Sequence, residues 1–213
     1  MVFGGETAES YYDEGLTATV RGDVVRAVAC FEKALELDRG FTAAVYQLAR
    51  CALRLGQAQR AVELLLELLR KNPNQTAALI DLGYALLALG KVADSVRSFQ
   101  QALEREPANS RALLGLAEVA FEEGKWAQAA SLARQSLLHS GPHFQALFLL
   151  GRAAQLTGDQ QTAEGNLQQA YALIEKSVEL NPDQPEAHFL RGEVDFVRKR
   201  FSAALESYRA ASE

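Results

Sequence analysis

Apolar residues in this chain recur three and four positions apart in short stretches, and glycine or proline separates one stretch from the next. Residues 76–109 show the pattern clearly. Leu79, Leu82 and Leu86 follow this spacing before Gly90, and the apolar residues after the glycine follow it again. Such spacing places apolar side chains on one face of a helix. The stretch therefore predicts a helix, a tight turn and a second helix.

This unit repeats with a period of 34 residues, which five turn glycines mark: Gly22, Gly56, Gly90, Gly124 and Gly158. A period of this length is typical of a solenoid, in which each unit packs only on its neighbours. We expect a single α-helical solenoid after a short N-terminal segment. The segment is residues 1–7, the solenoid is 8–213, and its six repeats span 8–41, 42–75, 76–109, 110–143, 144–184 and 185–213.

Repeat five departs from the period, because its closing proline, Pro182, comes seven residues late. Ala163, Leu167 and Ala170 begin an apolar spacing that continues through the added residues. Seven residues make about two helical turns, so an extension keeps the same face inward. The sequence predicts one long second helix over residues 160–180 and no looped insertion.

The residue types at fixed places in each repeat resemble the tetratricopeptide repeat family. The family pattern has a large apolar residue at position 4, Leu-Gly or Leu-Ala at 7 and 8, Ala at 20, an aromatic residue at 24, Ala at 27 and Pro at 32. Repeat three carries Leu79, Leu82, Gly83, Ser95, Phe99, Ala102 and Pro107 at these places. The resemblance covers about Ala8 to the end of the chain. It implies an all-α, right-handed solenoid whose first helices line a concave face.

The resemblance also implies that positions 2, 5, 9, 12 and 13 of each repeat point into this concave face. In this sequence they include large apolar side chains and arginines, which a solvated helix face does not need. Exposed apolar patches often mark binding sites, and aromatic and arginine side chains are common anchors at interfaces. The candidate residues of a peptide-binding groove are Tyr12, Tyr46, Arg50, Arg54, Ile80, Tyr84, Leu87, Leu114, Phe121, Phe148, Arg152, Phe189 and Phe196.

Two interpretations of this row stay open. In the first, an extended peptide or an amphipathic helix binds, with the aromatic side chains as apolar anchors. Arg50, Arg54 and Arg152 would then pair with acidic groups of the ligand. In the second, the residues at position 5 pack against neighbouring first helices and belong to the core.

Composition and charge exclude several classes of partner. The net charge is −5 and no basic tract is present, so we expect no nucleic acid. No apolar run approaches about 20 residues, so we expect no direct membrane insertion. Residues 1–5 have neither the positive nor the apolar region of a signal peptide. This favours a cytoplasmic protein, unless a removed leader preceded this sequence.

The sequence contains no convergent set of reactive groups, so we expect no enzyme, no cofactor and no metal. His139 and His143 have the four-residue spacing of a helical metal pair, but Gly141 and Pro142 lie between them and end the helix. The glycines occur in helix turns and form no phosphate-binding loop. Cys30 and Cys51 lack a C-x-x-C arrangement, and we expect both to be reduced packing thiols.

The sequence favours a non-catalytic scaffold for protein–protein interaction that binds a peptide or amphipathic helix in its groove. One alternative is self-assembly, because the sixth repeat lacks a polar capping helix and its second helix leaves apolar side chains uncovered. A homo-oligomer through this C-terminal repeat would follow. Another alternative is the repeat arm of a larger enzyme or of a secretion or pilus assembly component.

Overall fold

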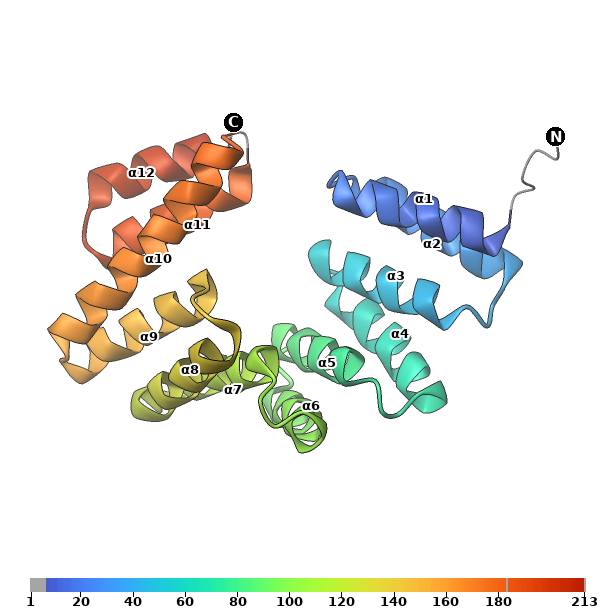
Figure 1. Cartoon of the computed structure of the whole chain (residues 1–213), viewed down its shortest axis with the longest axis horizontal. Coiled ribbons are helices and arrows are strands. Elements are labelled where there is room, and N and C mark those ends of the chain that lie inside the picture. Colours follow the sequence, from blue (N-terminus) through green and yellow to red (C-terminus); the bar gives the residue numbers. More distant parts are fainter. Residues whose placement is uncertain (1–6, 183, 213) are drawn as a thin grey trace. The chain divides into compact units, whose positions relative to one another are not determined.

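In the computed structural model, every regular element among the described residues, 7–182 and 184–212, is an α-helix. The helices form consecutive pairs, and each pair coincides with one predicted repeat (Figure 1). The predicted all-α architecture of six helix-turn-helix repeats is confirmed. Residues 1–6 of the expected N-terminal segment lie outside the described residues. The helices are α1 (Ala8–Val20), α2 (Val24–Leu37), α3 (Thr42–Arg54), α4 (Ala58–Lys71), α5 (Thr76–Ala88), α6 (Val92–Arg105), α7 (Ser110–Glu122), α8 (Trp126–Ser140), α9 (Phe144–Thr157), α10 (Gln160–Leu180), α11 (Pro185–Val197) and α12 (Phe201–Ala210).

Contacts between helices divide the chain into two compact units, which we describe separately. Unit 1 is residues 1–107 and contains α1–α6, and unit 2 is residues 108–213 and contains α7–α12. Within each unit, helices that follow each other in the sequence pack against each other, so the helix pairs are stacked in the order of the sequence. The first helices of successive repeats also meet, α3 with α5 and α7 with α9.

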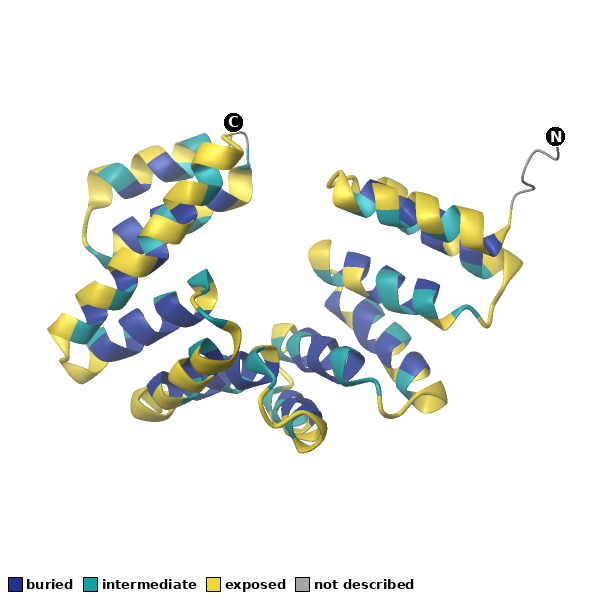
Figure 2. Cartoon of the chain, in the orientation of Figure 1, coloured by how far each residue is buried: buried dark blue, intermediate teal, exposed yellow. Residues whose placement is uncertain are grey.

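The core of unit 1 consists of small and aliphatic side chains spaced three and four residues apart on each helix. Leu65 and Leu68 of α4 lie in one cluster with Val45 of α3 and Leu82 of α5. A second cluster around Phe31 joins α1, α2 and α3. Burial of one stripe per helix is what the amphipathic sequence pattern predicts, and Figure 2 shows the stripes.

The core of unit 2 has the same construction. Leu114 of α7, Ala133 of α8 and Leu150 of α9 belong to one cluster. Leu147 of α9 and Leu167 of α10 belong to another, which α11 completes. Each of the first two helix pairs of unit 2 is therefore joined by buried side chains to the pair that follows it.

The long second helix of repeat five is confirmed, because α10 runs without interruption from Gln160 to Leu180. The Asp159 side chain caps its start by accepting a hydrogen bond from the backbone N–H of Thr162. Ile174, in the second half of α10, is buried in one cluster with Val194 of α11. The extension therefore reaches the last helix pair and helps to hold it.

The turn inside each repeat requires one residue with left-handed backbone conformation. Gly90 has φ of 70°, and the N–H of Lys91 donates back to the carbonyl of Leu86, which closes the helix end. In the last repeat Lys199 occupies the same place with φ of 61°. A residue with a Cβ atom is strained in this conformation by about 1–2 kcal/mol, so Lys199 makes the last turn less stable than glycine would.

Glycine also allows the two helices of a repeat to approach closely. A Cβ atom on Gly83 would lie 2.5 Å from the ring of Phe99, and one on Gly192 would lie 2.6 Å from the ring of Tyr208. Both distances are far shorter than any real van der Waals contact. The pairing of glycine with a large ring therefore fixes how the first and second helices of these repeats pack.

Candidate binding surface

The candidate residues all lie on the first helix of a repeat, and we call the face that carries them the first-helix surface. In unit 1 it belongs to α1, α3 and α5, and in unit 2 to α7, α9 and α11. Apolar residues three and four positions apart form one stripe along each first helix, and this stripe packs in the core. The side chains on the rest of the helix face outward. We describe the surface of each unit by itself.

Tyr46 on α3 presents a half-buried ring whose hydroxyl group is already used. The hydroxyl donates a hydrogen bond to Oδ2 of Asp81 on α5 at 2.8 Å, and Asp81 is buried. The guanidinium carbon of Arg50, one turn later, lies 5.9 Å from the centre of the ring. Tyr46 therefore offers a fixed apolar ring with a cation beside it.

The neighbouring positions of unit 1 add further accessible side chains. Tyr84 and Leu87 on α5 are half-buried, and Arg54 at the end of α3 is exposed. The Tyr84 ring meets the fully buried Phe99 ring edge to face, with centroids 5.1 Å apart. One side of Tyr84 is thus anchored in the core, which holds the ring in place.

Three predicted contact residues are used in packing. Ile80 and Leu114 are 2% and 6% exposed, so at these two places the packing interpretation of position 5 holds. Tyr12 is half-buried, and its ring lies 4.9 Å from Phe41 and 5.7 Å from Phe31. The row expected at position 5 is therefore interrupted by core residues.

The first-helix surface of unit 2 contains a cluster of rings around one arginine. The guanidinium carbon of Arg152 on α9 lies 4.8 Å from the ring centre of Phe121 on α7 and 5.7 Å from that of Phe148. The Phe148 ring in turn stacks on Phe144, with centroids 5.3 Å apart. These cation–π contacts orient Arg152 and tie α7 to α9.

A carboxyl group lies on the same helix as Phe121. Loss of solvation on burial, together with the nearby charge of Glu122, raises the pKa of Glu118 to about 7. Glu118 therefore carries only part of a negative charge at neutral pH. Glu118 is at position 9 of repeat four, one of the positions that the family resemblance places on the concave face, but it was not among the candidate groove residues.

The last first helix, α11, carries two exposed aromatic side chains. Phe189 and Phe196 are 50% and 56% exposed. The Phe189 ring lies 5.7 Å from Tyr208, and the Phe196 ring meets Phe201 edge to face at the same distance. Both rings present large apolar areas at the surface.

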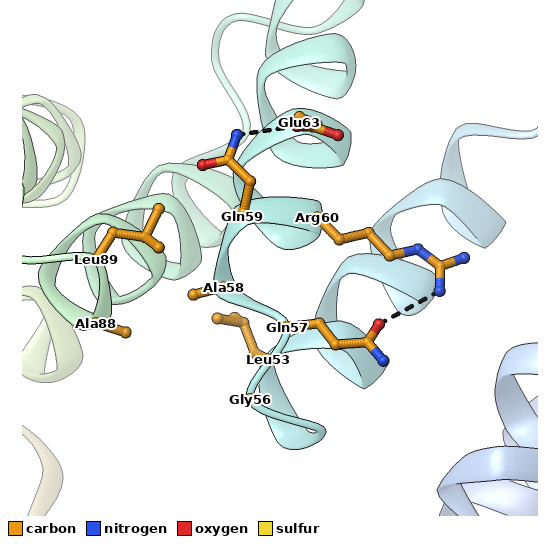
Figure 3. Close-up of a pocket in the computed structure, with 9 residues that line it drawn as sticks. All are labelled: Leu53, Gly56, Gln57, Ala58, Gln59, Arg60, Glu63, Ala88 and Leu89. Atoms are coloured by element: carbon orange, nitrogen blue, oxygen red, sulfur yellow. Dashed lines mark hydrogen bonds between the residues drawn. The ribbon is translucent and has the colours of Figure 1, made fainter.

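A shallow hollow of about 600 Å³ lies in unit 1 where α3 and α5 end (Figure 3). Its apolar wall includes Leu53, Ala88 and Leu89, and its polar wall includes Gln59, whose amide donates to Glu63 at 2.9 Å. The polar side chains around it bond to one another, so the hollow offers an apolar surface and no cluster of reactive groups.

The contact between Ser136 and His143 superficially resembles a nucleophile and its base. Ser136 Oγ lies 3.2 Å from His143 Nε2, but Ser136 is fully buried and its hydroxyl donates to the carbonyl of Ser110 at 2.9 Å. A substrate has no access to this hydroxyl, so the pair serves to link α8 with the starts of α7 and α9.

Cys30 and Cys51 are both free and buried, and burial raises the pKa of each thiol. Within residues 7–182 and 184–212, no three His, Cys, Asp or Glu side chains gather as metal ligands would. None of the helices in the same residues is both long enough and apolar enough to cross a membrane.

The architecture and the pairing of small with large residues define a helical repeat protein. A family model described as tetratricopeptide repeat matches residues 80–142 and 162–213, and a second model with the same description matches residues 21–83. The chain belongs to the tetratricopeptide repeat family. No curated protein sequence matches the chain.

Several solved structures share the fold. TTC0263, a tetratricopeptide repeat protein of Thermus thermophilus, has a TM-score of 0.69 at 21% identity and covers 93% of this chain and 99% of its own. PilW, a type IV pilus biogenesis factor, has a TM-score of 0.71 at 19% identity and covers 96% and 91%. MamA of Desulfovibrio magneticus RS-1, from residue 41 to its end, has a TM-score of 0.65 at 19% identity and covers 81% and 97%. At these identities the likeness concerns the fold alone.

Proposed function

We propose that this chain is a non-catalytic scaffold that binds a peptide or an amphipathic helix of a partner protein on its first-helix surface. The observation that supports the proposal most is the accessible aromatic ring with an arginine beside it, which occurs in both units. In unit 1 the pair is Tyr46 with Arg50. In unit 2 Arg152 lies against the rings of Phe121 and Phe148.

Such pairs suit recognition because they are ordered before a ligand arrives. The hydrogen bond to Asp81 fixes Tyr46, and the contact with Phe99 fixes Tyr84. A ligand that packs on these rings gains apolar contact without the cost of immobilising flexible side chains. The rings would be the apolar anchors of the interface.

The arginines of the first-helix surface would give it a preference for ligands with acidic groups. Arg50 and Arg54 of α3 are exposed, so an acidic group of a ligand could form a charge-assisted hydrogen bond with either. Arg152 is held by two rings, which leaves its guanidinium oriented for one further partner. The proposed ligand of unit 1 therefore carries apolar side chains next to an acidic residue.

Selection from a displayed library of short random peptides tests the proposal. We expect the selected peptides to share apolar and acidic residues and to lose most of their affinity for a variant with Tyr46, Tyr84 and Phe148 changed to alanine. The matched control changes Leu37, Leu66 and Leu138, which are exposed residues of second helices, to alanine. Unchanged binding by the first variant, with lowered stability in circular dichroism melts, would show that the rings serve only the core.

A further inference from the structure

A carboxyl group is buried in the last helix pair at a place that holds an apolar residue in every other repeat. Asp195 of α11 is 1% exposed, and it is at position 11 of repeat six. The residues at position 11 of repeats one to five are all buried and apolar: Ala18, Ala52, Leu86, Ala120 and Ala154. Repeat six therefore contains an ionisable group where the other repeats place an apolar side chain.

The Asp195 carboxyl group lacks hydrogen bonds that a buried charge needs. In the part of the chain that the structure describes, its Oδ1 atom and Nη1 of Arg198 are the buried side-chain atoms without a hydrogen-bond partner. By contrast, Asp81, the buried acid of α5, accepts a hydrogen bond from the Tyr46 hydroxyl at 2.8 Å. An ionised carboxylate without donors is unfavourable inside a protein, and protonation removes most of this penalty.

The arginines near Asp195 are held by other partners. Arg198 forms an ion pair with Glu164 at the start of α10. Nε of Arg191 donates to Oγ of Ser207 on α12 at 3.0 Å. These two arginines therefore join α11 to its neighbours, and their positive charges act on Asp195 without a hydrogen bond to it.

Charged and titratable groups face Asp195 from each helix that packs around it. They are Tyr171 and Glu175 of α10, Arg191 and Arg198 of α11 and its end, and Arg200 and Tyr208 at the start of α12 and within it. Loss of solvation on burial is the largest influence and raises the pKa of Asp195, although the three arginines act in the opposite direction. Because the pKa is raised in the folded chain, acidification stabilises the packing around Asp195, and this stabilisation is lost as pH rises through the folded value.

The effect of this buried group should stay local. Helix α12 packs on α11, and α11 packs on α10. Nearest-neighbour contacts determine the local stability of a solenoid, so the last pair can open while the preceding repeats stay folded. The strained turn at Lys199 lowers the stability of the same pair.

We propose that Asp195 makes the docking of α11 and α12 on α10 sensitive to pH. With a protonated carboxyl group the last pair is closed on α10, and with an ionised one it opens locally while the rest of unit 2 stays folded. Phe189 and Phe196 lie on α11, so opening would remove these two rings from the first-helix surface. The inference does not depend on the ligand proposed above, because it concerns the packing of helices in the free protein.

Native-state hydrogen exchange of the whole chain at about pH 4 and about pH 8 tests the proposal, after correction for intrinsic exchange rates. We expect the protection of the α11 and α12 amides to fall by about tenfold between the two pH values. Asp195→Ala, which introduces the alanine found at position 11 of four other repeats, should raise this protection at the higher pH and remove its pH dependence. Glu118→Gln removes the carboxyl group of α7 whose pKa is raised, and this control should leave the pH dependence of α11 and α12 unchanged.

Asp195→Asn is a second variant, which keeps the shape of the side chain but cannot ionise. It should also remove the pH dependence, so the test does not rest on the alanine variant alone. Equal protection of α11 and α12 at both pH values in the unchanged chain would overturn the proposal, and so would a pH dependence that persists in Asp195→Asn. A loss of protection that is equal in α7–α12 would also overturn it, because unit 2 would then open as a whole. Circular dichroism establishes that each variant is folded before protection is compared.

Discussion

Single residues adjust the distance between the two helices of each repeat. In repeats one, three, five and six the first helix carries glycine opposite a large side chain of the second helix, as Gly83 does for Phe99 and Gly151 for Leu167. In repeat two Ala49 takes this place opposite Leu65. In repeat four both places are taken by alanine, Ala117 and Ala133, in one cluster. The sizes of the two residues compensate, so the helices of each repeat pack densely.

This compensation predicts opposite effects for the same substitution at two glycines. Gly83→Ala should lower the free energy of unfolding by about 2 kcal/mol, because the added Cβ atom would collide with the Phe99 ring. Gly165→Ala should raise it by about 1 kcal/mol, because no neighbouring atom lies within 4 Å of that site in α10. Urea denaturation followed by circular dichroism measures both. Equal effects at the two sites would contradict the packing account.

Glu118 gives the stability of the protein a specific pH dependence. Its pKa of about 7 in the folded chain lies above the ordinary value of 4.5, so the folded state keeps a proton that the unfolded state loses between these values. Glu118 therefore does not destabilise the fold below pH 4.5, its destabilising effect grows as pH rises from 4.5 to about 7, and the effect stays constant above that. Glu118→Gln should be more stable than the unchanged chain at pH 8 by on the order of 2–3 kcal/mol and equally stable at pH 4. Identical profiles of unfolding free energy against pH for the two proteins would contradict this.

Sequence reasoning at the residue scale predicted which residues lie on first helices but not how far each is exposed. Ile80 and Leu114 share position 5 with Tyr46, yet they are buried and Tyr46 is half-buried. Repeat position determines the direction of a side chain, whereas exposure depends on the size of its neighbours. The hydrogen bond between Tyr46 and Asp81 was also not predictable, because the repeat pattern contains no signal for a polar contact between two particular side chains of different repeats.

At the scale of elements, α10 shows how a solenoid accepts an insertion. The added residues continue the helix, and their apolar side chains keep the direction of those before them. The sequence predicted this helix correctly because seven residues rotate the helix by only about 20° from whole turns. An insertion that is not close to a whole number of turns would rotate the following apolar side chains away from the core, and a continuous helix would not have been expected.

Deletions in α10 test this phase argument. Removal of residues 168–174 takes out two turns and should leave α11 and α12 packed, because Val178 then follows Leu167 in the spacing of the other repeats. Removal of residues 168–172 rotates the following residues by about 140° and should cost on the order of 3 kcal/mol more, since buried side chains turn outward. Thermal unfolding and tryptic digestion compare the two. A shorter deletion that is no worse than the longer one would disprove the phase argument.

At the scale of the whole molecule, stability is distributed among repeats. Each unit has its own clusters of buried side chains, and each helix packs mainly on its neighbours in the sequence. Local stability should then be a sum of repeat and nearest-neighbour contributions. The sequence predicted the six repeats because their period is regular, but it contained no signal for the division after residue 107.

A substitution in one unit should therefore lower the local stability of that unit more than that of the other unit. Leu65 of α4 is fully buried, and Leu65→Ala should lower the amide protection of α3–α6 by on the order of 3 kcal/mol. Protection of α9–α12 should change by less than a third of that amount. Native-state hydrogen exchange resolves the two regions. An equal loss everywhere would mean that the chain unfolds as one cooperative block.

The proposed function depends on the first helices as the elements that meet the partner, and nuclear magnetic resonance tests this most directly. A peptide selected on the protein is added to the isotopically labelled chain, and the amide shifts of all helices are followed. We predict that the largest shifts occur on α3 and α5, on α7 and α9, or on both pairs, near Tyr46, Tyr84, Phe121 and Phe148. Shifts confined to the second helices, with these four residues unchanged at saturation, would contradict the account.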